Sequence, residues 1–387
     1  MRVMHIITSL DAGGAEAMLF RLLGRFDCDI ADICVVSLKD EGVYGEKIRN
    51  IGAQVECVGL ERALKAPSAL LKLMRIIQRH KPDIVQTWMY HADLIGGLAA
   101  FFLGRIPLAW GIHHSIPNRK YDKKSTMHIA RACSFLSKRV PSKIVCSSIL
   151  AKSRHVVFGY DNSKMTVITN GVDTAEFMPD SEARMRLRRL TGLRDDDFVV
   201  GFPARFHPIK GHQVFLKAAS MIAKNAANVK YLLCGDGVES SNIELQSMIN
   251  KVGIGDRVIM LGVFNEMKNY FAGIDAMAMT SYSESFPLTL IEAMSCGVPC
   301  VVTDVGDCAE IVGETGFITP VGDSDASAKA ICKILNMRVE DRSALGSAAR
   351  RRVKENYAID ITVDKYRDLY REMIEENNMS RRISRDC

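Results

Sequence analysis

Two cationic side chains in the segment 203–211 have the types and spacing expected of a diphosphate-binding group. Arg205 and Lys210 lie five residues apart, directly after an apolar run, and a proline and a glycine bound the segment. A planar guanidinium and a compact ammonium are common protein partners of phosphate oxygens. We therefore interpret the pair as part of a ligand site, in preference to a solvated loop.

Two carboxylates in the segment 282–292 suit a ligand that is rich in hydroxyl groups. Glu284 precedes a predicted helix that opens with a serine and a proline, and Glu292 lies two turns inside it among apolar residues. Glu292 could simply lie on a solvated face of the helix. In the alternative that we favour, both carboxylates accept hydrogen bonds from a polyol and the helix N-terminus receives phosphate.

Two further loops carry glycines and histidines after apolar runs. Gly13 and Gly14 would let backbone N–H groups approach a phosphate, although a tight strand–helix turn explains them equally well. His113 and His114 follow a later run, where a histidine can act as a general base or a hydrogen-bond partner. We expect one of these two histidines to be structural.

Other patterns that could hold a metal are better explained as ordinary turns. The Asp-x-Asp pairs all precede strands or open helices: Asp27/Asp29, Asp195/Asp197 and Asp323/Asp325. Cys296 and Cys300 bracket a turn, so we do not expect a zinc site there. The eleven cysteines contain no CxxC pair and several lie in apolar runs, which favours reduced thiols in a cytoplasmic protein.

The elements that must position these residues alternate between strand-like and helix-like patterns over 387 residues, a length that suggests two domains. In the first half the expected strands are 3–7, 33–37, 54–58, 83–87, 107–112 and 143–146, and the helices are 15–23, 67–78, 93–102 and 126–137. The pattern then restarts, with strands at 198–202, 229–234, 257–260, 276–279 and 299–302 and helices at 213–223, 241–251, 267–271 and 288–295. Apolar strands separated by helices predict α/β domains with doubly wound parallel sheets, which bind ligands beyond the carboxyl ends of the strands.

We place the domain boundaries near the Asn-Gly turn at 170–171 and Pro179, and again before the last helix. The predicted domains are 1–175, 176–357 and a C-terminal segment, 358–387, that packs back on the first domain and frays from Ser380.

The net charge and the hydropathy pattern limit the classes of partner that we expect for this protein. The net charge of +6 is too small to argue for nucleic acid. The chain opens without a secretory signal pattern, and no run approaches the ~18–20 apolar residues that span a bilayer. Lys72, Arg75 and Arg79 share a predicted helix, whose basic face could be solvated or could touch anionic lipid.

Taken in order, these motifs resemble glycosyltransferase family 4, whose members have the GT-B fold of two Rossmann-like domains facing across a cleft. The most specific match is the E-x7-E motif from Glu284 to Glu292. Further matches are Arg205 with Lys210, and the segments 13–16, 170–173, 235–237 and 293–299. The resemblance covers nearly the whole chain.

The resemblance implies a role for each residue. Arg205 and Lys210 would bind the donor diphosphate, with Glu284 on the sugar hydroxyls and Glu292 on the ribose. The remaining donor-binding residues would be Gly13, Gly14, Gly235, Val263 (near the base), Phe286, and Leu288 and Thr289 through their backbone N–H groups. His113 matches the family histidine near the anomeric carbon, and the resemblance leaves the choice between His113 and His114 open.

The implied activity is retaining transfer from a nucleotide sugar, with UDP as the expected nucleotide, to a glycan or lipid-linked acceptor in polysaccharide biosynthesis. The family is described as reacting on one face of the sugar, with no metal and no resident cofactor. A cytoplasmic protein with peripheral contact to the inner membrane face would fit such acceptors. The alternatives are a non-hydrolysing nucleotide-sugar epimerase of the same fold and a non-catalytic sugar-nucleotide binder, whereas the absence of GxGxxG disfavours a dehydrogenase.

Overall fold

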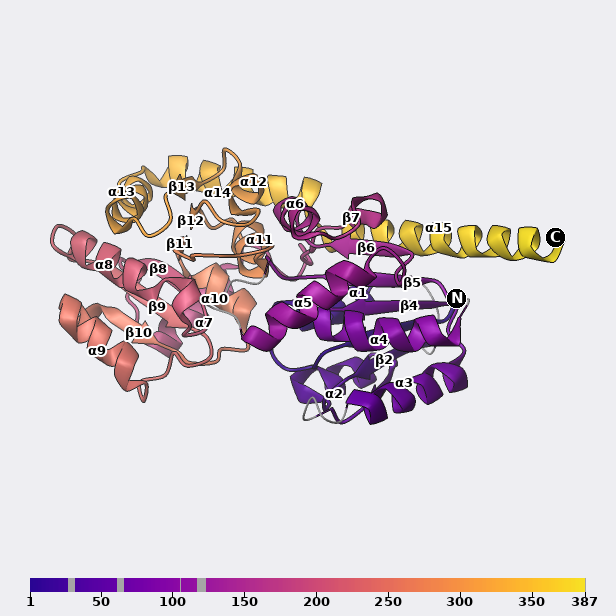
Figure 1. Cartoon of the computed structure of the whole chain (residues 1–387). Coiled ribbons are helices and arrows are strands. Elements are labelled where there is room, and N and C mark those ends of the chain that lie inside the picture. Colours follow the sequence, from indigo (N-terminus) through magenta and orange to yellow (C-terminus); the bar gives the residue numbers. More distant parts are fainter. Residues whose placement is uncertain (27–31, 61–65, 105, 117–122, 387) are drawn as a thin grey trace. The chain divides into compact units, whose positions relative to one another are not determined.

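The chain forms two compact units. The computed structural model describes residues 1–26, 32–60, 66–104, 106–116 and 123–386. Unit 1 comprises Met1–Gly171 and Ile359–Cys387, and unit 2 comprises Val172–Ala358 (Figure 1). The sequence placed these boundaries after residues 175 and 357.

Unit 1 is built on a seven-stranded parallel sheet with the order β3-β2-β1-β4-β5-β6-β7. The strands are β1 (Val3–Ile7), β2 (Ile33–Ser37), β3 (Gln54–Cys57), β4 (Ile84–Trp88), β5 (Leu108–Ile112), β6 (Lys143–Cys146) and β7 (Met165–Val167). The strand order reverses between β1 and β4. Such a reversal opens a crevice at the carboxyl ends of the two strands, where α/β proteins bind ligands.

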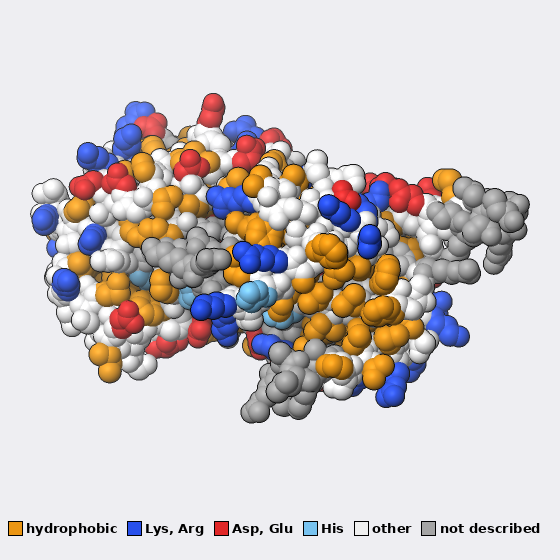
Figure 2. All heavy atoms as spheres, in the orientation of Figure 1, with side chains coloured by type: hydrophobic (Ala, Val, Ile, Leu, Met, Phe, Trp, Pro, Cys, Tyr) orange, Lys and Arg blue, Asp and Glu red, His pale blue; other side chains and the backbone are white. Residues whose placement is uncertain are grey.

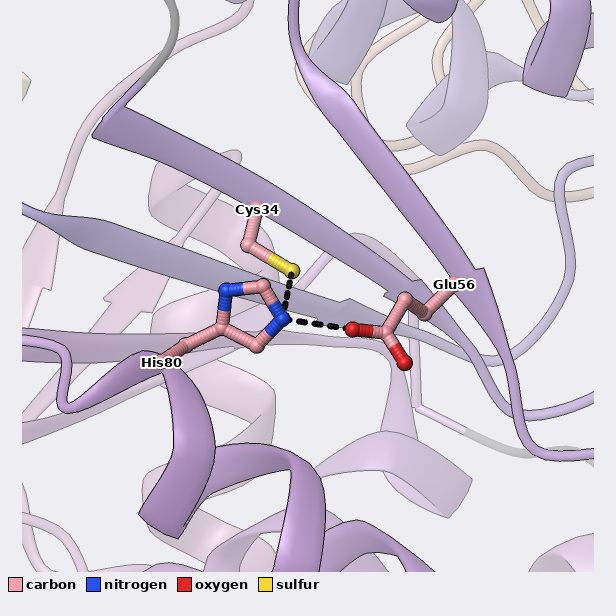
Figure 3. A group of neighbouring side chains, drawn as sticks. All are labelled: Cys34, Glu56 and His80. Carbon is pink, nitrogen blue, oxygen red and sulfur yellow. Dashed lines mark hydrogen bonds and ion pairs between the residues drawn. The ribbon is translucent and has the colours of Figure 1, made fainter.

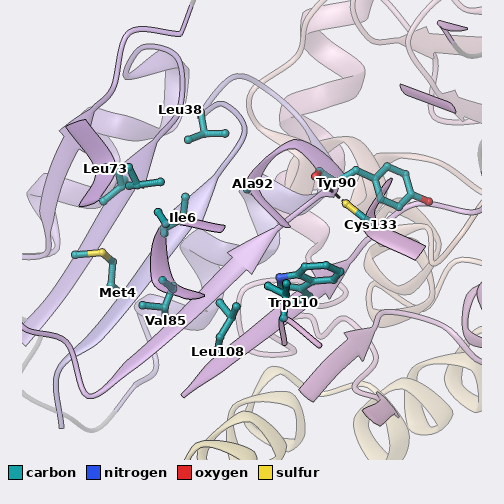
Figure 4. Close-up of a cluster of buried hydrophobic side chains, with 14 of the residues drawn as sticks. Met4, Ile6, Leu38, Leu73, Val85, Tyr90, Ala92, Leu108, Trp110 and Cys133 are labelled. Carbon is teal, nitrogen blue, oxygen red and sulfur yellow. Dashed lines mark hydrogen bonds between the residues drawn. The ribbon is translucent and has the colours of Figure 1, made fainter. Parts of the chain in front are cut away.

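Helices cover both faces of this sheet. They are α1 (Gly14–Leu23), α2 (Gly42–Asn50), α3 (Ala66–His80), α4 (Tyr90–Leu103), α5 (Lys124–Leu136), α6 (Ile149–Phe158) and α15 (Ile359–Asp386). One core lies between the sheet and α3, α4 and α5, where Leu73, Ala92 and Cys133 meet strand residues such as Ile6 and Trp110 (Figure 4). Because most strands are buried on both faces, they read as continuous apolar runs.

The second core of unit 1 depends on α15. Val363, Tyr366 and Tyr370 on this helix pack with residues of α1, α2 and the sheet. The helix continues to Asp386 through the segment in which the sequence predicted fraying. Residues distant in sequence therefore complete the core of the first domain.

Unit 2 contains a six-stranded parallel sheet with the order β10-β9-β8-β11-β12-β13. Its strands are β8 (Phe198–Pro203), β9 (Val229–Cys234), β10 (Val258–Met260), β11 (Ala276–Met279), β12 (Cys300–Thr303) and β13 (Phe317–Thr319). Here the order reverses between β8 and β11, the two strands that precede Lys210 and Glu284.

The helices of unit 2 are α7 (Ser181–Thr191), α8 (His212–Ala223), α9 (Ile243–Val252), α10 (Met267–Gly273), α11 (Leu288–Ser295), α12 (Cys308–Val312), α13 (Ser324–Leu335) and α14 (Val339–Asn356). Residues of α8, α9 and α13 form one core with the sheet, and α11 packs against α10 and α14. The fold is therefore doubly wound in both units.

Candidate functional site

The structure brings together two predicted site residues that lie 74 positions apart. Lys210 Nζ is 2.6 Å from Glu284 Oε1, and Ser281 Oγ donates a second hydrogen bond of 2.6 Å to the same oxygen. The side chains are 24% and 9% exposed for Lys210 and Glu284, respectively. The ion pair thus lies at the strand reversal of unit 2, partly shielded from water, with the lysine still accessible to a ligand.

The loop that carries Lys210 is held against the end of β11 by backbone contacts. Tyr282 N donates to Ile209 O at 2.7 Å, and Thr280 Oγ1 donates to Gly211 O at 3.0 Å. Gly211 has φ +72°, and a Cβ built there would overlap Thr280 O. A glycine is therefore required immediately after Lys210, and it holds the backbone that carries this lysine against the end of β11.

Arg205 begins the same loop and is exposed. It abuts the loop after β9, because a Cβ built on Gly235 would lie 2.7 Å from Arg205 N and 2.6 Å from Ala204 O. Gly235 also has φ +142°, so a side chain there would be strained. Gly235 N donates to Gly262 O at 2.7 Å, which places exposed Val263 beside these two loops.

The segment after Glu284 leads into α11 at the same edge of the sheet. Phe286 is buried and its ring meets Tyr357 edge-on, with centroids 5.5 Å apart. Leu288 and Thr289 open α11 after Pro287, so their backbone N–H groups lie at a helix N-terminus, where anions are favoured.

Glu292 lies inside α11 and is only 5% exposed. The alternative that it belongs to a solvated helix face is therefore wrong. Its carboxylate lies near Cys234, the last residue of β9. Burial raises the pKa of that thiol to about 12, and the Glu292 charge acts in the same direction. Glu292 thus reaches from α11 toward the carboxyl end of a strand. We refer to Arg205, Lys210, Gly235, Glu284, Glu292 and the start of α11 as the unit 2 site.

Unit 1 presents a different environment at the carboxyl ends of β4 and β5. The His113 ring stacks on Trp88 with centroids 4.6 Å apart and an interplanar angle of 17°. Burial lowers the pKa of His113 to about 4, and the neighbouring Asn170 side chain opposes this shift. The ring is therefore neutral near pH 7.

His114 differs from its neighbour. Its Nδ1 is hydrogen-bonded to the carbonyl of Ser115, and its ring is tilted against Tyr90 at 6.0 Å. Of the two histidines, His113 is the one that stacks on a strand residue and has both ring nitrogens buried.

Two residues that sequence reasoning missed support His113. Trp88, the last residue of β4, provides the stacking surface and donates from Nε1 to His5 Nδ1 at 3.1 Å. Asp93 accepts from Thr87 Oγ1 at 2.6 Å and from Gly111 N at 3.3 Å. Burial raises the pKa of Asp93 to about 8. Asp93 therefore links the ends of β4 and β5, and its only signal in the sequence was an acid in an apolar helix.

The loop after β1 holds Gly13 and Gly14 at the start of α1. Gly13 is the N-cap and has an extended backbone that any residue can adopt. The Glu16 carboxylate folds back over Gly13, and burial raises the pKa of Glu16. Glu16, which the sequence analysis named only within the matched segment 13–16, thus lies directly against the glycine loop. We refer to Gly13, Gly14, Trp88 and His113 as the unit 1 site.

The Asp-x-Asp pairs and the basic helix face, which the sequence analysis did not assign to the site, have structural roles among the described residues. Asp197 accepts from Arg194 N at 2.8 Å before β8, and Asp323 caps α13 through Ala326 N at 2.8 Å. Asp27 and Asp29 lie outside the described residues. Lys72 Nζ donates to Cys57 O at 2.8 Å and Arg79 pairs with Glu56, so this helix face makes protein contacts.

Known proteins share the whole architecture. A crystal structure of the Anabaena protein HepE in complex with UDP and glucose matches with a TM-score of 0.85 at 23% identity, covering 95% of this chain and 99% of that chain. Two doubly wound units with sites at their strand reversals, and this match, define the class: a GT-B fold of two Rossmann-like domains.

Sequence comparisons give the family. Residues 12–176 match the family model described as Glycosyltransferase Family 4, and residues 184–352 match that described as Glycosyl transferases group 1. The chain belongs to glycosyltransferase family 4.

Two full-length relatives are similar at low identity. One is the Escherichia coli UDP-Gal:alpha-D-GlcNAc-diphosphoundecaprenol alpha-1,3-galactosyltransferase, 24% identical, with 92% of each chain covered. The other is the Staphylococcus aureus capsular polysaccharide biosynthesis glycosyltransferase CapM, 25% identical, with 89% of this chain and 91% of that protein covered. Among the described residues, no helix is both long and apolar enough to cross a membrane.

Proposed function

We propose that this glycosyltransferase moves a sugar from a UDP-sugar to a glycan or lipid-linked acceptor in polysaccharide biosynthesis, with retention of anomeric configuration. The observation that carries the proposal is the Lys210–Glu284 pair at the strand reversal of unit 2, 2.6 Å apart. The relatives add support, because the Escherichia coli enzyme is named for UDP-Gal and a diphosphoundecaprenol acceptor.

The unit 2 site has the charges that the leaving group needs. Glycosyl transfer passes through an oxocarbenium-like state while negative charge grows on the departing diphosphate. Arg205, Lys210 and the N–H groups of Leu288 and Thr289 would stabilise this charge without a metal ion. We accordingly propose that neither a metal nor a resident cofactor takes part.

The remaining residues of unit 2 would bind the rest of the donor. Glu284 would accept hydrogen bonds from sugar hydroxyls, with Lys210 holding its carboxylate in place. Glu292, buried on α11, would accept from the ribose. Gly235, Val263 and Phe286, which lie on three loops of unit 2, would contact the nucleotide.

The unit 1 site favours retention. An inverting enzyme needs a general base opposite the leaving group, and such a base works best with a pKa near the operating pH. Burial holds the pKa of His113 at about 4, so it is a weak base and better suited to hydrogen-bond the sugar. Gly13 and Gly14 would approach the donor phosphate through their backbone.

An acceptor carried on a lipid would require contact with the cytoplasmic membrane face, and unit 1 has a surface suited to that contact. Phe101 and Phe102 on α4 are 48% and 61% exposed, and Phe135 on α5 is 74% exposed. Arg131 and Arg139 are exposed on and beside α5. Figure 2 shows hydrophobic side chains gathered where α4 and α5 lie. Exposed aromatic and basic side chains together favour an anionic lipid surface.

The activity is tested by incubating the purified protein with individual UDP-sugars and membrane extract, and analysing both donor and lipid products. Transfer to an extractable acceptor, absent from the Lys210→Ala variant, supports the proposal. Interconversion of the donor sugar without acceptor would instead identify an epimerase. Donor binding with no turnover on any acceptor would identify a binding protein.

The stereochemistry is tested on the first-formed product by its anomeric coupling constant in NMR. An α-linked donor should give an α-linked product. A β-linked product would overturn retention and would make His113 the candidate base.

Membrane contact is tested by co-sedimentation with anionic and zwitterionic vesicles. We expect binding to anionic vesicles that weakens in the Phe102→Ser/Phe135→Ser variant. Equal binding of this variant and the unaltered protein would reject this surface.

A further inference from the structure

Three side chains with metal-ligating atoms meet in unit 1, on elements that the proposed reaction does not use. They are Cys34 on β2, Glu56 on β3 and His80 at the end of α3 (Figure 3). One potential ligand atom from each lies within 4.8 Å of the other two. Cys34 Sγ is 3.8 Å from His80 Nε2, and this nitrogen is 2.5 Å from Glu56 Oε1.

The fold itself brings these residues together. In the parallel pairing of β2 with β3, Cys34 lies opposite Gln54, so Glu56 is two residues further along and points to the same face of the sheet. The same face is covered by α3, whose last residue is His80. His80 comes before β4, whereas the unit 1 site follows β4 and β5.

An ion pair alone accounts for only part of this cluster. Arg79 and His80 both contact the Glu56 carboxylate, which would satisfy its charge. The buried thiol of Cys34, 4% exposed, adds nothing to such a pair, yet its sulfur is turned toward the imidazole. A cavity of about 200 Å³ lined by Cys34, His80, Arg79 and Asp32, among others, lies beside the cluster. That volume exceeds the ~10–15 Å³ that one water needs by the same measure, so a water bound to the ion has room beside Cys34 and His80.

We propose that Cys34 Sγ, His80 Nε2 and a Glu56 carboxylate oxygen bind one Zn²⁺, with water as the fourth ligand. Thiolate, imidazole and carboxylate are the three zinc ligands that proteins use. With Zn–S of about 2.3 Å and Zn–N of about 2.0 Å, tetrahedral geometry separates sulfur and nitrogen by about 3.5 Å. The sulfur and nitrogen, 3.8 Å apart, are already near this spacing.

Two small changes accompany binding. The Glu56 oxygen moves from 2.5 Å to about 3.3 Å from Nε2, so that the hydrogen bond opens and the ion enters. The thiol proton of Cys34 is released to solvent as the sulfur coordinates. The imidazole gives up the Nε2 proton that it donated to Glu56 and takes one from water on Nδ1, so that the Nε2 lone pair binds the ion. The Arg79 side chain, 63% exposed, is free to swing into water and remove its positive charge from the ion.

A bound ion would cross-link the edge of the unit 1 sheet to α3. A metal that binds the folded chain and not the unfolded chain raises stability in proportion to the logarithm of its concentration over Kd. The site would therefore control the stability of unit 1 and leave the transfer reaction unchanged.

The test is a titration of the metal-free full-length protein with Co²⁺, followed by displacement with Zn²⁺. We expect one equivalent of Co²⁺ to give a thiolate charge-transfer band in the near ultraviolet, which Zn²⁺ removes. Cys34→Ser should abolish the band, and His80→Asn and Glu56→Gln should weaken binding. The matched control is Cys57→Ser, because Cys57 is the neighbouring thiol on β3 and lies outside the cluster.

Thermal unfolding provides the second measurement. Zn²⁺ should raise the Tm of the unaltered protein and of Cys57→Ser, but not that of Cys34→Ser. If Cys34→Ser fails to fold, Glu56→Gln takes its place in both measurements. Absence of the band, its survival in Cys34→Ser, or an equal Tm shift in all variants would overturn the proposal.

Discussion

The two candidate sites of this glycosyltransferase lie at equivalent places in their folds but differ in charge: the unit 2 site is built on charged side chains, and the unit 1 site on neutral ones. In unit 2, a lysine and a glutamate from neighbouring loops form an ion pair at 2.6 Å, with an arginine exposed on the same loop. In unit 1, burial keeps His113 neutral and an aromatic ring stacks on it. Both follow the strand reversal of a doubly wound sheet.

This difference separates two tasks that a transferase must perform. Stabilising a departing diphosphate needs fixed charges that are already oriented before the reaction. Orienting a neutral sugar needs shape and hydrogen bonds in a water-poor environment. The same fold serves both tasks because the site residues lie in loops after the strands.

The largest effect on turnover is expected from substitution of Lys210. Lys210→Ala removes a preorganised cation, so kcat should fall on the order of 10²–10³-fold at saturating UDP-sugar. The control is Lys217→Ala, an exposed lysine on α8, which should retain activity. Turnover in Lys210→Ala equal to that of the control would remove the charged role assigned to unit 2.

A smaller loss of turnover is expected from substitution of His113. His113→Ala removes a hydrogen-bonding ring, and a typical net hydrogen bond corresponds to about a tenfold change in rate. His114→Ala should have less effect, since that ring is hydrogen-bonded to Ser115 O. Kinetics of both variants at pH 7.5 would decide between the histidines. A greater loss in His114→Ala would reverse the assignment.

As the pH is lowered, we expect unit 1 to unfold at a higher pH than unit 2. In unit 1, burial lowers the pKa of His5 to about 3 and those of His113 and His155 to about 4, and it also lowers the pKa of His91; in unit 2, burial lowers the pKa of His212 to about 4. Between about pH 6.5 and pH 4 the unfolded chain binds more protons at these sites, so stability falls as pH falls. Asp93, with its pKa raised to about 8, acts in the opposite direction and offsets one histidine.

Hydrogen exchange followed by mass spectrometry at several pH values measures this order. Peptides of β4 and β5 should lose protection at a higher pH than peptides of β8 and β11. Earlier opening of the unit 2 peptides would show that the buried histidines do not govern acid stability.

The smallest effect is expected from chelation. Because Arg205, Lys210 and a helix N-terminus would replace a metal, EDTA should leave kcat unchanged. Loss of turnover on chelation, restored by Mg²⁺ or Mn²⁺, would contradict the charge distribution proposed for unit 2. If the zinc site in unit 1 is occupied, the same treatment should lower Tm without lowering kcat.

Sequence patterns predicted the frame of the fold well, because buried parallel strands are continuous apolar runs. Every predicted strand begins and ends within one residue of an observed strand, as at 299–302 against Cys300–Thr303. The patterns missed short or amphipathic elements such as β7, β13 and α7. Ser181–Thr191 carries four arginines among few buried residues, so its helical period was weak.

The candidate site was predictable to the extent that its residues follow strands. Arg205, Lys210, Glu284 and His113 all occupy such positions, and Lys210 and Glu284 meet directly. Trp88 and Asp93 were missed, and Glu16 was matched only as part of the segment 13–16, with no role assigned. The roles of Trp88 and Asp93 depend on contacts that form only in the folded sheet, and an acid in an apolar helix does not by itself reveal which groups it will meet.

The chain leaves unit 1 at Gly171, forms unit 2, and returns to unit 1 at Ile359. This order has a consequence for folding during synthesis on the ribosome. Unit 1 lacks Val363, Tyr366 and Tyr370 of its second core until α15 has emerged, which happens only after all of unit 2. The usual order, in which the first-made domain folds first, is therefore reversed for completion of the core. Until α15 has been made, the part of this apolar core that α15 covers stays exposed, and chaperones bind such exposed apolar surface.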